Sequence, residues 1–268
     1  MRHKIEILLD SGVDRRELSA LAHADHPISA PLSDSTVAHL LHRAVRGQND
    51  HLIDLGCGDG TWLLRALQTY GGATAVGVDI SGAGFDDVLG EAARLGVADR
   101  LELRRQDVAE YRSSRKADLV LSVGAAYAFG GLLETLNAAR EHLAEDGLLL
   151  LGDCFWEHEP DPAVRAEIES GPQKFADLPT TVAQVVADGW TPVYGHTSTI
   201  EEWDEYQWCW TGTLAQWALD HPDHPDSEVA LRMSADHRTG WLGGYRGVLG
   251  FVVLLLRRTP PSAPTEAS

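Results

Sequence analysis

The chain has 268 residues, of which 40 are acidic and 22 basic, so its formal net charge is −18 at pH 7. A surface this negative repels polyanions, which argues against nucleic acid or an anionic membrane as the partner. No apolar run approaches the roughly 20 residues of a membrane-spanning helix, and three widely spaced cysteines favour reduced thiols. We therefore expect a single cytoplasmic domain over residues 1–258.

The first fifty residues are interpreted as a helical lid. Residues 26–34 contain two prolines and should be extended or turned, whereas residues 35–45 have a helical pattern. We hypothesise that this segment closes over a bound ligand.

Residues 51–152 alternate short apolar runs with helical patterns. Strands are predicted at 51–55, 75–79, 101–105, 118–123 and 148–151, and helices at 61–70, 87–95 and 132–143. This alternation is typical of βαβ units around a parallel sheet.

The regular alternation ends after residue 152. We predict a loop at 155–162, a helix at 180–187, a strand at 192–198, helices at 201–220 and 226–240, and a last strand at 248–256. Residues 199–245 would then form a helical cap inserted before the last strand. The polar, proline-rich residues 259–268 predict a disordered tail.

The first predicted strand leads into a glycine-rich turn that carries most of the chemical information. Asp54 is followed by Gly56, Gly58 and Gly60, and a helix begins directly afterwards. Alternating glycines let the backbone approach a ligand closely, and a helix N-terminus offers free N–H groups. The nicotinamide fingerprint needs its third glycine at position 61, where the chain has Thr61, so that class of oxidoreductase is disfavoured.

Two further acids end the next two strands. Asp79 closes the second strand, where a carboxylate can accept hydrogen bonds from ribose hydroxyls. Asp107 follows the third strand. Taken alone, Asp79 could equally cap a helix or a turn, and Asp107 could be a surface residue of a loop.

With these acids and glycines in order, the chain resembles the class I S-adenosylmethionine-dependent methyltransferases. The segments GAAYAFGG, EDGLLLLGD, CFW, WDEYQW and HPDHPD resemble, more narrowly, a bacterial group of predicted small-molecule enzymes within that class. The resemblance implies a doubly wound α/β fold with a seven-stranded, mostly parallel sheet, and a cofactor-binding core at residues 51–152.

The same resemblance implies S-adenosylmethionine as the cofactor and assigns roles at its binding site. Asp54 would hold the amino group of the cofactor, Asp79 its ribose and Asp107 its adenine amino group. The full set of implied cofactor-binding residues is Asp54, Gly56, Cys57, Gly58, Asp79, Ile80, Asp107, Val108 and Gly124. Ile80 and Val108 would flank the adenine ring.

The segment after the fourth strand narrows the substrate class. Residues 122–131 contain neither the Asn/Asp-Pro-Pro-aromatic motif of amino-directed nucleic-acid methyltransferases nor a catalytic cysteine, which favours a small-molecule substrate. The segment also lacks carboxylates that could bind a divalent metal, so we expect no metal.

Ligands of open α/β sheets lie beyond the carboxyl ends of the strands, so the following loops and the cap should meet the substrate. The candidate substrate-binding residues are Tyr127, Phe129, Trp156, Trp203, Tyr206 and Trp210. The aromatic residues at 203–217 share one helix face, and this stripe could instead pack the cap onto the sheet.

No residue stands out as an essential base. The weak candidates for a catalytic role are Asp153, His158 and His196, with Glu157 beside them. Asp153 replaces the glutamate that is typical of the bacterial group, which leaves its role open.

These observations favour a metal-independent enzyme that moves a methyl group to an N, O, S or C nucleophile of a small molecule by in-line displacement. The alternative is a non-methylating S-adenosylmethionine-binding protein of the same fold. The cofactor-binding residues alone do not separate the two.

Overall fold

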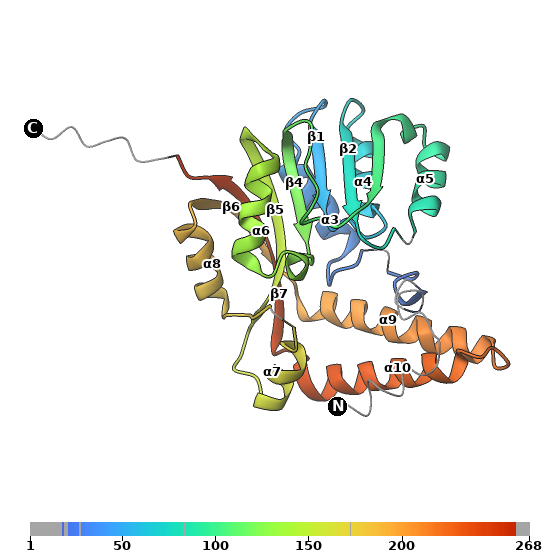
Figure 1. Cartoon of the computed structure of the whole chain (residues 1–268). Helices are drawn as coiled ribbons and strands as arrows, with labels where there is room; N and C mark the ends of the chain where they lie inside the picture. The colour runs from blue at the N-terminus through green and yellow to red at the C-terminus, as the bar shows by residue number, and fades with distance from the viewer. Residues whose placement is uncertain (1–17, 19–20, 27, 83, 172, 261–268) are drawn as a thin grey trace, which may run out of the picture.

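The computed structural model describes residues 18, 21–26, 28–82, 84–171 and 173–260, which form one seven-stranded sheet covered by helices on both faces (Figure 1). The strands are β1 (His51–Leu55), β2 (Thr74–Asp79), β3 (Leu101–Arg105), β4 (Ala117–Val123), β5 (Leu143–Trp156), β6 (Trp190–Thr197) and β7 (Leu249–Arg258). Their order is β3-β2-β1-β4-β5-β7-β6, and only β7 runs antiparallel to its neighbours. The predicted seven-stranded, mostly parallel sheet is confirmed.

The helices divide between the two faces of the sheet and a cap. They are α3 (Asp34–Ala44), α4 (Thr61–Thr69), α5 (Phe85–Arg94), α6 (Leu132–His142), α7 (Pro162–Ile168), α8 (Leu178–Ala187), α9 (Ile200–Asp220) and α10 (Ser227–Gly240). The apolar faces of α3, α4 and α5 pack on one side of the sheet, and those of α6 and α8 on the other. None of the helices in the described part of the chain is long and apolar enough to cross a membrane.

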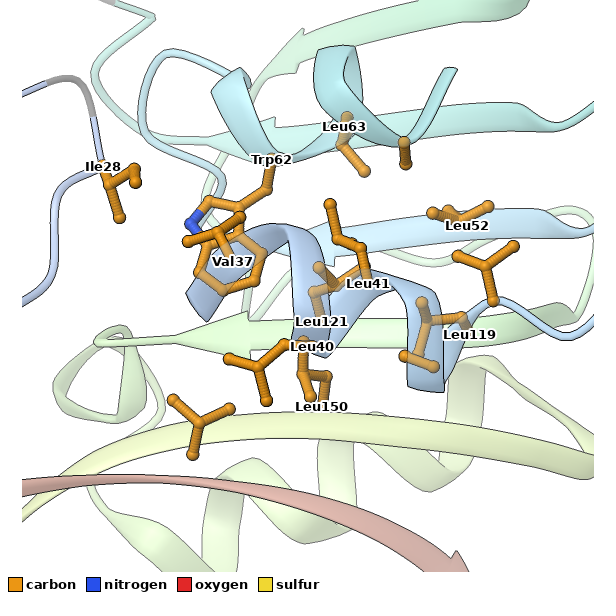
Figure 2. Packing of buried hydrophobic residues seen from close by; sticks show 14 of the residues in the cluster. Ile28, Val37, Leu40, Leu41, Leu52, Trp62, Leu63, Leu119, Leu121 and Leu150 are labelled. Atoms are coloured by element: carbon orange, nitrogen blue, oxygen red, sulfur yellow. The ribbon is translucent and has the colours of Figure 1, made fainter. Parts of the chain in front are cut away.

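The core on the α3 side fixes the position of β1. Figure 2 shows Val37, Leu40 and Leu41 of α3 facing leucines of the central strands. All five residues of β1 are buried because the strand is covered on both faces. Each fully buried leucine of this kind contributes roughly 1.5–3 kcal/mol. The carboxyl end of β1 is thus held firmly between β2 and β4, where the strand order reverses direction.

The cap has a small core of its own. Helices α9 and α10 lie side by side beyond one end of the sheet (Figure 1). Their buried side chains form a separate cluster to which the N-terminal residues Leu18 and Ala22 also belong. The cap is therefore built from two distant parts of the chain, whereas the sequence pattern assigned it to residues 199–245 alone.

One half-buried carboxylate joins the N-terminal segment, the cap and the sheet edge. Glu202 of α9 accepts hydrogen bonds from the backbone N–H of Ser33 (2.9 Å) and the hydroxyl of Thr36 (2.6 Å), at the start of α3. Its other oxygen lies 3.0 Å from the backbone nitrogen of Thr199 and 3.0 Å from Nε2 of His196 in β6. Burial alone would raise the pKa of Glu202, but these hydrogen bonds outweigh it and lower the pKa to about 2.

Three details differ from the expectation. The strand predicted at 148–151 extends over Leu143–Trp156, because the turn-like residues 146–147 are accommodated by a register shift opposite β4. The loop predicted at 155–162 is shorter, since α7 begins at Pro162, where Asp161 caps its first turn. The predicted disordered tail begins too early, because the backbone of Thr259 donates a hydrogen bond to Gly189 (2.9 Å). Residues 261–268 lie outside the described residues.

The substitution Glu202→Gln preserves the size of the side chain and removes its charge. Hydrogen bonds to charged groups contribute about 1.5–3 kcal/mol, so we expect the free energy of unfolding to fall by about 2 kcal/mol at neutral pH, measured by urea denaturation. The matched control is Glu201→Gln at the exposed neighbouring position, which should change it by less than about 0.5 kcal/mol.

The pH dependence of this difference has a definite sign. The pKa of Glu202 in the folded protein is lowered from 4.5 to about 2, so the ionised group stabilises the fold fully above pH 4.5. That contribution is lost as the pH falls from 4.5 towards 2. The difference between parent and Glu202→Gln should therefore shrink over this window, and a difference that grows on acidification would contradict the assignment.

Candidate functional site

A pocket opens at the carboxyl ends of β1, β2 and β4, beneath the N-terminal segment. Its lining residues are His23, Ser29, Ala30, Asp54, Gly56, Cys57, Gly58, Asp59, Trp62, Asp79, Val123, Gly124, Ala125 and Tyr127. Six of the residues that the sequence assigned to the cofactor are therefore brought together here, along with Tyr127 from the predicted substrate set. The pocket lies at the point where the strand order reverses, which is the usual ligand position in such sheets.

The glycine-rich turn after β1 forms the floor of the pocket. The backbone nitrogens of Gly56 and Cys57 both donate to the carbonyl oxygen of Val78, at 2.9 and 3.1 Å. Gly56 has φ +90°, and a Cβ there would lie 2.3 Å from the Cβ of Ala125. Gly58 has φ +57° and no side chain to separate a ligand from the backbone. The turn is thus compact and presents its main chain to the pocket.

Asp79 holds this turn in addition to its predicted role. One carboxylate oxygen accepts a hydrogen bond from the backbone of Gly58 (3.0 Å), and the other from the backbone of Ser81 (2.8 Å). Each carboxylate oxygen has two lone pairs, so the group can still accept hydrogen bonds from a ligand. The end of β2 therefore both shapes the pocket and offers it a polar surface.

Asp54 is the most unusual group in the pocket. Its side chain is 4% exposed, and burial together with the negative charges of Asp79 and Asp59 raises its pKa to about 7. Within the described residues, no donor forms a hydrogen bond with its carboxylate, and no group of His, Cys, Asp or Glu could hold a metal ion. A buried carboxylate without an internal partner is costly, so the pocket is suited to a ligand that carries a positive charge.

Several lining residues were not anticipated. His23, Ser29 and Ala30 come from the N-terminal segment, and Asp59 and Trp62 flank the start of α4. Asp59 lies within the glycine-rich motif that follows β1. Its carboxylate accepts a hydrogen bond from the backbone N–H of Thr61 (2.9 Å). The N-terminal residues had no local signal, because only the tertiary fold carries them over the pocket.

The segment hypothesised as a lid is firmly anchored. Ile28, Ala30 and Leu32 are each at most 3% exposed and belong to the main core. The segment therefore forms a wall of the pocket in this structure. Its opening as a lid stays a prediction.

The residues predicted to contact an adenine ring lie outside the pocket lining. Asp107 is exposed, and its carboxylate accepts a hydrogen bond from the backbone of Ala109 (2.9 Å). Ile80 is 57% exposed and Val108 is buried. The neighbouring Gln106 donates to the carbonyl of Asp79 (2.9 Å), which ties the β3 loop to the end of β2.

Most of the predicted substrate-binding aromatics are packing residues or lie away from the pocket. Trp156 is buried in the main core, where its Nε1 donates to Glu169 (2.9 Å), and Phe129 packs against the core on the α6 side. Trp210 stacks on His237 inside the cap, with ring centroids 4.1 Å apart. Trp203 and Tyr206 lie between the cap and the sheet.

The candidate catalytic residues do not line the pocket either. Asp153 is 8% exposed and accepts hydrogen bonds from Gln173 and from its neighbour's backbone, both at 2.8 Å. Burial raises the pKa of Asp153 to about 7 against the opposing effect of these bonds. His196 is paired with Glu202, whereas Glu157 and His158 are exposed. A catalytic role for any of them stays a prediction.

Comparison with known proteins gives consistent results. A family model described as "Methyltransferase domain" matches residues 47–218. The uncharacterised protein YjhP of Escherichia coli K12 is 25% identical over 213 residues, which cover 79% of this chain and 86% of YjhP.

Two solved structures share the fold. One is a SAM-dependent methyltransferase from Geobacter sulfurreducens in complex with S-adenosyl-L-homocysteine, with a TM-score of 0.83 and 23% identity over 90% of this chain and 98% of its own. The other, from Thiobacillus denitrificans and bound to the same ligand, has a TM-score of 0.82 and 24% identity over 92% of this chain and 99% of its own.

The substitution Gly56→Ala tests how tightly the turn is packed. The new Cβ would overlap Ala125 and force a left-handed φ on alanine, so we expect a loss of about 1–3 kcal/mol in the free energy of unfolding. The control is Gly90→Ala in the exposed part of α5, where nothing lies within 4 Å of an added Cβ. It should gain about 0.5–1 kcal/mol, and equal effects of the two changes would contradict the described packing.

The substitution Asp54→Asn tests the electrostatic strain of the pocket. Because the pKa of Asp54 is raised from 3.8 to about 7, ionisation destabilises the folded, ligand-free protein progressively as the pH rises between these values. Asn removes that cost, so the melting temperature of Asp54→Asn should exceed that of the parent by more at pH 8 than at pH 4. Asp87→Asn, at an exposed position of α5, is the control for the loss of one negative charge. A gain in melting temperature that is the same at both pH values would contradict the destabilisation assigned to ionised Asp54.

Proposed function

The chain belongs to the methyltransferase domain family, and from this premise we propose that its pocket binds S-adenosylmethionine, whose methyl group it passes to a small molecule without a metal. When bound, the cofactor supplies a methyl group already activated on a sulfonium. The protein then has to bind the cofactor, orient the acceptor and exclude water.

The buried carboxylate of Asp54 carries this proposal. S-adenosylmethionine has an ammonium group and a positive sulfonium, and the pocket offers Asp54, Asp59 and Asp79 without a described cationic side chain in its lining. A cation next to Asp54 would return the pKa of this group towards its ordinary range and repay the cost of burying it. A neutral or anionic cofactor would leave that cost in place.

The remaining cofactor contacts follow from the edges of the pocket. The free lone pairs of Asp79 suit the ribose hydroxyls, and the main chain of Gly56, Gly58 and Gly124 leaves room for close approach. Cys57 lines the same surface as a buried thiol whose pKa is raised by burial, so it contributes packing rather than reactivity. We place the adenine against exposed Ile80, with Asp107 and Val108 at the rim.

A small acceptor is supported by charge and by architecture. The net charge of −18 disfavours nucleic acid, and the N-terminal wall, which contributes His23, Ser29 and Ala30 to the lining, restricts access to the pocket. Positioning of the acceptor against the activated methyl group can account for about 7–11 kcal/mol of the barrier, so a bound, water-poor geometry is the main requirement. Tyr127 lines the pocket and is 67% exposed, which leaves its ring available to an acceptor.

Calorimetric titration with S-adenosylmethionine and S-adenosylhomocysteine tests the proposal directly. Both ligands carry the ammonium group, so Asp54→Asn should weaken the binding of both. We expect a decrease in affinity of about 10–100-fold, because one hydrogen bond between charged groups is lost. Asp87→Asn should leave both affinities unchanged. Absence of binding to the intact protein would overturn the proposed function, and binding of NADH instead would indicate an oxidoreductase.

A further inference from the structure

His23 connects the proposed cofactor pocket with a group of aromatic side chains under the cap. It lines the pocket together with Asp54, Gly58 and Tyr127. Its ring also lies 5.7 Å from the ring of Tyr206, centroid to centroid. Trp203 and Tyr206 in turn are 6.4 Å apart in a T-shaped contact. The imidazole therefore stands at the boundary between the cofactor and the cap.

Among the residues that the structure describes, two buried polar atoms in this region have no hydrogen-bond partner. Nδ1 of His23 and Nε1 of Trp203 form no hydrogen bond, although Trp203 is only 8% exposed. Buried polar groups are normally paired, and each exception calls for an explanation. The neighbouring His26 behaves ordinarily, since its Nδ1 lies 2.7 Å from the carbonyl oxygen of Ile28. The unpartnered Nδ1 is therefore specific to His23 and is not shared by the neighbouring histidine of the same segment.

We propose that the methyl acceptor binds between His23 and Tyr127, and that it is an aromatic molecule whose hydroxyl group donates a hydrogen bond to Nδ1 of His23. This inference rests on the proposed function and specifies its substrate class. The tyrosine ring supplies a flat apolar surface, and the three aspartates of the pocket repel acceptors that carry a carboxylate or a phosphate. A hydroxyl acceptor loses a proton during methylation, and His23 is the described imidazole that lines the pocket.

The imidazole is in the protonation state that can accept a hydrogen bond. Burial, with a smaller contribution from His26, lowers the pKa of His23 to about 4, so the ring is neutral at pH 7 and has a lone pair to offer. Within the aromatic region, His237 is held neutral in the same way, at a pKa of about 4, and is engaged by Gln207 at 2.6 Å. His23 is therefore the free imidazole of the two.

The proposed methyl transfer conserves atoms, electrons and charge. A lone pair of the acceptor oxygen forms the new bond to the methyl carbon, and the carbon–sulfur bond breaks with its electron pair left on sulfur. The sulfonium becomes a neutral thioether, and the hydroxyl proton moves to Nδ1 of His23. The positive charge lost at sulfur is thus replaced by one on the imidazole, whose low pKa then favours release of the proton. The proton then passes to solvent.

The test uses 2-naphthol as the probe and the full chain loaded with S-adenosylhomocysteine. We expect 2-naphthol to bind, and 2-methoxynaphthalene, which lacks the donor, to bind about tenfold more weakly. His23→Leu should lower the affinity for 2-naphthol by about tenfold. His23→Asn places an amide near the position of Nδ1, so it should retain binding within about threefold and yet lower the rate of methyl transfer to 2-naphthol by about 100-fold or more.

The controls separate this inference from the proposed function. His42→Asn, at an exposed imidazole of α3 outside the pocket lining, should change neither binding nor transfer. Binding of S-adenosylhomocysteine should persist in every variant, and its absence in the parent would overturn the proposed function itself. With that binding intact, failure of 2-naphthol to bind, equal binding of its methyl ether, or full transfer activity in His23→Asn would each overturn the acceptor site. Thermal melting of His23→Leu establishes that this variant is folded.

Discussion

Two hydrogen bonds to a single carbonyl oxygen determine the geometry of the pocket. The backbone nitrogens of Gly56 and Cys57 both reach Val78, so the chain leaving β1 turns back over the end of β2 instead of continuing along the sheet. This turn is possible because the left-handed conformation of Gly56 places no side chain against Ala125. Asp79 then fixes the next residue of the turn. The position of every other pocket group is set relative to this pair of strand ends.

The pocket also depends on a charge arrangement that opposes folding. Three carboxylates converge on a region whose described lining residues include no compensating cation, and one of the three is almost completely buried. The extensive core around β1 provides the stability that tolerates this arrangement. Such local strain at a ligand site is typical of proteins that bind a cationic ligand tightly, because binding removes the strain.

Much of the fold and part of the site could be predicted from local sequence signals. The strands β1 to β4 and the glycine turn follow from alternation and spacing, and Asp54, Gly58 and Asp79 lie together as expected. The extension of β5 could not be predicted, because it depends on pairing of Leu143 with β4 and of residues 152–156 with β7, which is distant in the sequence. The aromatic periodicity of α9 predicted burial but not the burying partner, so Trp210 could not be distinguished from a pocket residue. His23 and Ser29 reach the pocket only through tertiary structure, and no local pattern marks them.

The separate small core of the cap has an evolutionary consequence. Leu214 of α9 and Val229 of α10 pack with Leu18 and Ala22, whereas Trp203 of α9 packs into the main core, so only substitutions within the small core leave the packing around β1 untouched. Mutations at distant, independent sites combine additively. Substitutions in this small core can therefore accumulate while the glycine turn and its aspartates keep their positions. The fold separates a part that tolerates change from the part that shapes the pocket.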